Sequence, residues 1–184
     1  MNILDAQINY WNLGLSFCRE VSCFITPETG LISITTNDAH GEVDFGWEKI
    51  WDTIKSNQEK CTKAIMIHTH PDGINQMSSK DINMVQGWRL ALGMPIDFFI
   101  VCSSYHNNQK SMEISHDLCD RDDNKKIFIE KIKHEDIFEI PIGLSIMSEI
   151  LYGISKEPNP IKKEDLMEIE KVIKSSKINK MFNQ

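Results

Sequence analysis

Apolar residues fall at alternate positions from Val21 to Ile25, and this period of two predicts a strand over Arg19–Thr26. A second strand is expected over Leu31–Thr36. The intervening turn, Pro27–Gly30, is typical of a hairpin that joins two neighbouring strands.

Helical and strand patterns alternate through the next part of the chain. A helix is expected over Asp44–Lys60, because four large apolar residues recur on one face at helical spacing: Trp47, Ile50, Trp51 and Ile54. We expect this stripe to pack in the core. A strand over Lys63–His68, a helix over Ser79–Leu92 and an apolar strand over Ile96–Cys102 follow. This order predicts an α/β sandwich.

The last third of the chain has a weaker pattern. A returning strand is expected over Ser111–Ser115, a helix over Pro141–Tyr152 and an amphipathic helix over Lys162–Lys174. We therefore divide the chain into a main domain, residues 1–135, and a helical C-terminal extension, residues 136–184. The extension is expected to pack on the main domain or to mediate an interaction.

Composition limits the classes of function. The chain has 184 residues, of which 41% are apolar and 26% charged, as in an ordinary globular protein. Its net charge of −7 argues against a nucleic-acid-binding surface, which is usually basic. No apolar run approaches the roughly 20 residues that span a bilayer, and the N-terminus lacks the features of a secretory signal. Five cysteines without a C-x-x-C pair fit the cytoplasm, which we expect as the location.

The richest candidate chemistry is the run His68-Thr69-His70-Pro71, followed by Ser78-Ser79-Lys80-Asp81. Residues i and i+2 of a strand share one face, so the two imidazoles should project together near an aspartate at the start of the next helix. Zinc accepts both ligand types at about 2.0–2.2 Å. Two simpler interpretations exist. A histidine at a strand end often serves structure alone, and Ser78-x-x-Asp81 also fits a helix capping box.

The same run resembles the JAMM motif of the JAB/MPN metalloproteases, which is His-x-His-Pro, six residues, then Ser-x-x-Asp. This sequence meets the motif without a gap, and the similarity extends from about Glu20 to about Cys102. The resemblance implies a JAB/MPN-like, cytidine-deaminase-like fold, a three-layer sandwich with helices on both sides of a mixed sheet. It also implies that His68, His70 and Asp81 bind Zn²⁺.

The family requires an upstream glutamate as general base, and it uses the motif serine to stabilise the oxyanion. The resemblance therefore assigns catalytic roles to Glu20 and Ser78. Glu42 is the alternative base, because it lies closer to the histidines in sequence. Family members often carry glycine and leucine soon after this glutamate, whereas Ser22-Cys23-Phe24 stands here.

The resemblance implies a zinc-dependent metalloprotease or isopeptidase. Its expected partner is a protein substrate, such as a ubiquitin-like or other lysine-linked conjugate, and homodimer formation stays open. Two alternatives remain, a non-catalytic JAB-fold scaffold or binding module and a RadC-like protein of unclear role. Relatives without activity usually lack a metal ligand, and all three are present in this chain, which favours an enzyme.

Overall fold

A computed structural model describes residues 19–37, 44–70, 77–106, 109–118, 128–133, 142–157 and 159–183. Glu42 and the expected domain boundary between residues 135 and 136 lie outside these ranges. The following description concerns the described residues alone.

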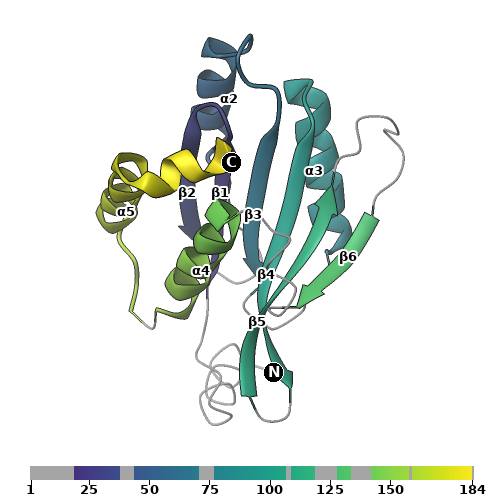
Figure 1. Cartoon of the computed structure of the whole chain (residues 1–184), viewed down its shortest axis with the longest axis vertical. Helices are drawn as coiled ribbons and strands as arrows, with labels where there is room; N and C mark the ends of the chain where they lie inside the picture. The colour runs from purple at the N-terminus through teal and green to yellow at the C-terminus, as the bar shows by residue number, and fades with distance from the viewer. Residues whose placement is uncertain are drawn as a thin grey trace.

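The centre of the molecule is a mixed sheet with the strand order β2-β1-β3-β4-β5-β6 (Figure 1). Neighbouring strands are antiparallel except for β3 and β4, which are parallel and connected through a helix. The strands are β1 (Glu20–Thr26), β2 (Gly30–Asn37), β3 (Ala64–His70), β4 (Ile96–His106), β5 (Gln109–Leu118) and β6 (Phe128–Lys133).

Helices cover both faces of the sheet. One face packs against α2 (Trp47–Ser56) and α3 (Ser79–Leu92), whose buried Ile50, Ile54 and Val85 join the core with strand residues such as Phe24. The opposite face packs against the C-terminal helices, which contribute Leu144, Met147 and Leu166 to a second core. These helices are α4 (Ile142–Lys156), α5 (Lys163–Ser175) and the 3₁₀-helix η2 (Lys177–Asn183) (Figure 1). The predicted α/β class with a mixed sheet between helices is therefore confirmed.

The elements agree with the sequence pattern in most places. The predicted hairpin forms β1 and β2, and α3 spans the predicted residues. Strand β4 continues to His106, beyond the predicted end, and β6 was not predicted. The aromatic stripe of α2 was only partly right, because Ile50 and Ile54 are buried whereas Trp47 is 40% exposed. No helix in the described ranges combines the length and apolar character needed to cross a membrane.

The C-terminal helices also protect the free edge of the sheet at β2. Glu170 of α5 accepts a hydrogen bond from the Ile34 N–H at 2.8 Å, and Asn179 of η2 accepts one from the Leu31 N–H at 2.8 Å. Glu170 also pairs with Lys49 of α2 at 2.5 Å, so one side chain joins helices from both faces around β2. The N–H groups of Leu31 and Ile34 at this edge are thus satisfied by side chains rather than available to another strand.

Burial raises the pKa of Glu170, but hydrogen bonds from Lys49 and Ile34, together with the charges of Lys49 and Lys174, outweigh burial and hold this pKa below its usual value. The ionised carboxylate therefore stabilises the folded state at neutral pH. Glu170→Gln should lower the free energy of unfolding by about 1–2 kcal/mol at pH 7, measured by urea denaturation. Because the folded-state pKa is depressed, the difference from wild type should narrow as the pH falls below about 4. Glu168→Gln, which changes an exposed glutamate of the same helix, should leave stability unchanged.

Candidate metal centre

The two motif histidines lie at the C-terminal end of β3 on one face of the sheet. Met66 of the same strand packs in the core under α2 and α3, and His68 and His70 follow it at alternate positions. They therefore project toward the layer formed by α2 and α3. His68 is buried, and His70 is slightly more accessible.

Asp81 reaches the histidines from the first turn of α3. Its Oδ2 atom accepts a hydrogen bond from the Ser78 N–H at 2.7 Å, and its own N–H donates to Ser78 Oγ at 3.1 Å. This is the capping box that the sequence predicted. The cap and the metal-ligand arrangement use the same side chain, so the two interpretations are compatible.

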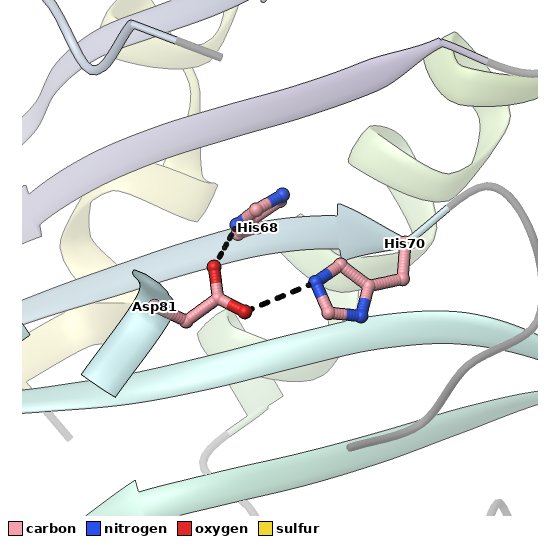
Figure 2. Close-up of side chains that lie close together, drawn as sticks. All are labelled: His68, His70 and Asp81. Carbon is pink, nitrogen blue, oxygen red and sulfur yellow. Dashed lines mark ion pairs between the residues drawn. The ribbon is translucent and has the colours of Figure 1, made fainter. Parts of the chain in front are cut away.

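Figure 2 shows the Asp81 carboxylate between the two imidazole rings. Asp81 Oδ1 lies 3.5 Å from His68 Nδ1, and Asp81 Oδ2 lies 3.5 Å from His70 Nε2. One ligand atom from each residue falls within 4.8 Å of the other two. Two ligands bound at about 2.1 Å in tetrahedral geometry would be separated by about 3.4 Å. A buried group of this composition and spacing is able to bind a metal ion.

The surroundings of His68 test the simpler view that it is a structural histidine. Its ring contacts Phe45 and Phe98 at centroid distances of 6.1 and 6.2 Å. Both ring nitrogens are buried, and neither makes a hydrogen bond to any residue that the structure describes. Buried polar atoms are normally satisfied, so one of these two nitrogens fits a role in which it donates its lone pair to a cation.

The charge state of Asp81 also suits a ligand. Burial raises the pKa of its carboxyl group, whereas interactions with His70 and Ser78 and the nearby imidazole of His68 lower it. The lowering interactions dominate, and the pKa falls from 3.8 to about 2. The carboxylate is therefore ionised at neutral pH, as a metal ligand must be.

The candidate base, Glu20, lies at the start of β1 beside this group. Its Oε2 atom is 3.4 Å from His68 Nε2, and the residue is 8% exposed. Glu42 belongs to the residues outside the described ranges, so no position can be compared with that of Glu20.

The hydroxyl of Ser78 takes part in the capping box with Asp81. Its oxygen accepts the Asp81 N–H at 3.1 Å, and a hydrogen bond between the Ser78 side chain and the Asp81 carboxylate contributes to the low pKa of Asp81. Sequence reasoning did not identify Phe45, which packs on His68 from the segment before α2. Phe45 lies inside the predicted helix Asp44–Lys60 but is not part of its apolar stripe, so the pattern carried no signal for this contact.

Comparison with known proteins gives no assignment. No protein-family model matches the chain, and no curated protein matches it.

We expect His70→Ala and Asp81→Ala to lose the bound metal, because each removes one of three ligands. Metal content of the purified proteins, measured by elemental analysis after incubation with Zn²⁺, checks this. Asp165→Ala is a matched control, since Asp165 occupies the same capping position in α5, where its Oδ2 accepts the Lys162 N–H at 3.1 Å. The control should retain metal. Stoichiometric metal in both ligand variants would contradict the assignment.

Proposed function

We propose that the chain is a zinc-dependent metalloprotease or isopeptidase of the JAB/MPN type. It would hydrolyse an amide bond in a ubiquitin-like or other lysine-linked protein conjugate. The observation that carries the proposal is the convergence of His68 and His70 with the helix-opening Asp81, at spacings compatible with tetrahedral zinc.

Zinc suits this donor set better than the common hard cations do. Two imidazoles and one carboxylate are the ligands of many catalytic zinc sites, whereas calcium and magnesium prefer oxygen alone. When bound, zinc lowers the pKa of a water ligand from about 15.7 toward about 7 and polarises a carbonyl group. A JAB/MPN-type fold is supported by the α/β sandwich and by the position of the motif on β3 and α3.

Glu20 is suited to move the proton in this reaction. Its carboxylate lies beside the metal-ligand group, 3.4 Å from His68. It would take a proton from the attacking water as the oxygen bonds to the carbonyl carbon. It would then pass this proton to the leaving nitrogen as the C–N bond breaks, which yields an acid and an amine. General acid–base catalysis of this kind contributes about 10²–10⁴-fold.

Ser78 is suited to stabilise the negative charge that develops on the carbonyl oxygen. The capping box fixes its side chain beside the metal-ligand group, where its O–H would donate to the carbonyl oxygen of a bound substrate. A preorganised donor costs little reorganisation when charge develops in the transition state.

The substrate class comes from the resemblance, since many JAB/MPN enzymes cleave isopeptide bonds to lysine. Peptide and isopeptide bonds present the same amide group to the site. The alternatives are a non-catalytic scaffold or binding module, which would not cleave a conjugate, and a RadC-like protein of unclear role. A cleavage assay on zinc-loaded protein separates them from the enzyme.

Glu20→Gln should retain stoichiometric zinc and lose about 10²–10⁴-fold in kcat, because the amide cannot accept the proton. The assay uses ubiquitin whose C-terminus is joined to the lysine side chain of a fluorescent peptide. Glu42→Gln is the comparison. If Glu42→Gln loses activity and Glu20→Gln keeps full activity, the general base is Glu42 rather than Glu20.

Ser78→Ala should reduce kcat by about 10²–10³-fold, as expected when one oxyanion donor is removed. It should also lower stability by about 1 kcal/mol through loss of the cap. Ser79→Ala, which changes the exposed neighbouring serine, serves as control and should behave as wild type. If kcat is unchanged in Ser78→Ala although the cap is lost, the residue has only a structural role.

A further inference from the structure

The sheet opens between β1 and β3 at the metal centre. The pairing of these strands ends at Ser22 and His68. Each of the two strands stays paired for longer with its other neighbour. Glu20 of β1 pairs with Asn37 of β2, and His70 of β3 pairs with Cys102 of β4. Glu20 and His70 therefore lie on strands that no longer pair with each other.

The hydroxyl of Thr69 bridges this opening. Thr69 Oγ1 accepts a hydrogen bond from the Val21 N–H at 2.9 Å and donates to the Arg19 carbonyl oxygen at 3.5 Å. These two backbone groups belong to the two peptide bonds that flank Glu20. Thr69 is 1% exposed, so water does not compete for these contacts.

Thr69 lies between two metal-ligand residues but is not one of them. Successive strand residues point to opposite faces, so its side chain is directed away from the imidazoles of His68 and His70. Its hydroxyl contacts the backbone of β1 instead. Thr69 is thereby linked to the backbone on both sides of Glu20, whose carboxylate lies beside His68.

We infer that Thr69 is a positioning residue, whose hydroxyl fixes the backbone of Glu20 and so holds its carboxylate beside the metal centre. This inference rests on the proposed function for the catalytic role of Glu20. Ordinary strand pairing would also hold the backbone, but it would require β1 and β3 to stay paired as far as Glu20 and His70, whereas their pairing ends at Ser22 and His68. A side-chain hydroxyl satisfies the Val21 N–H while the strands stay apart.

Thr69→Val tests the role of the hydroxyl, because valine keeps the shape of threonine but its side chain cannot accept or donate a hydrogen bond. In the conjugate-cleavage assay, kcat should fall about 10–10²-fold, as expected when a catalytic group is held less accurately. KM and zinc content should stay unchanged, because no ligand is touched. Thr69→Ser should restore kcat to near the wild-type value. If valine prevents folding, Thr69→Ala provides the same comparison with Thr69→Ser.

Thr26→Val is the matched control. Thr26 is a fully buried threonine at the other end of β1, where its hydroxyl accepts the Thr29 N–H at 3.1 Å. Its replacement removes the same buried hydroxyl group, but from a contact at the far end of β1 from Glu20, and kcat should not change. An equal fall of kcat in Thr26→Val would show a general loss of strand order and overturn the inference.

NMR of the zinc-loaded protein tests the positioning without substrate. In Thr69→Val, the Val21 amide should exchange its hydrogen faster than in the wild-type protein. The chemical shifts of the His68 ring should change in the same direction as they do in Glu20→Gln. Thr69→Ser should change neither. Unchanged Val21 exchange and unchanged His68 signals in Thr69→Val would overturn the inference, whatever the cleavage result. If the wild-type protein cleaves no conjugate but both NMR changes occur, the proposed function fails and the positioning by Thr69 stands.

Discussion

The carboxylate of Asp81 connects the start of α3 to the end of β3, and the candidate metal centre depends on this connection. One of its oxygens accepts the Ser78 N–H at 2.7 Å, while the two oxygens face His68 and His70 at 3.5 Å each. The cap restricts the side chain before any ligand arrives. Since the helix that follows a parallel strand begins at the carboxyl end of that strand, the β3–α3–β4 connection delivers Asp81 to the histidines.

The electrostatics of the candidate metal centre follow from the burial of two carboxylates, those of Asp81 and Glu20, close to each other. Asp81 and Glu20 are 7% and 8% exposed, and both lie within 3.5 Å of a nitrogen of His68. Two buried carboxylates are costly without a compensating positive charge. A divalent cation bound by His68, His70 and Asp81 would supply that charge and would bind one of the two His68 nitrogens that make no hydrogen bond within the described residues. The electrostatic balance of this group thus favours a bound cation, as the proposed function requires.

The C-terminal helices stabilise the sheet on which the centre is built. They cover the face opposite the histidines, and they protect the edge of β2 through Glu170 and Asn179. The contact at Asn179 leaves no room for a side chain on Gly30, which has a φ of 76°. Helices distant in sequence therefore hold β2 against β1, the strand that carries Glu20.

Short-range patterns in the sequence by themselves determined the hairpin, the buried strands, α3 with its capping box, and the set of residues at the candidate metal centre. These features depend on short-range patterns, such as alternation in β1 and the Ser78-x-x-Asp81 spacing, which act within a few residues. The exposure of Trp47 and the edge contacts of Glu170 depend on packing between distant segments, and β6 is defined by its pairing with β5. The tertiary structure alone decided that β1 and β3 separate at Ser22 and His68, with Thr69 between them. A hydroxyl that replaces strand pairing can be recognised only when both strands are in place, because its partners are backbone groups that every residue carries.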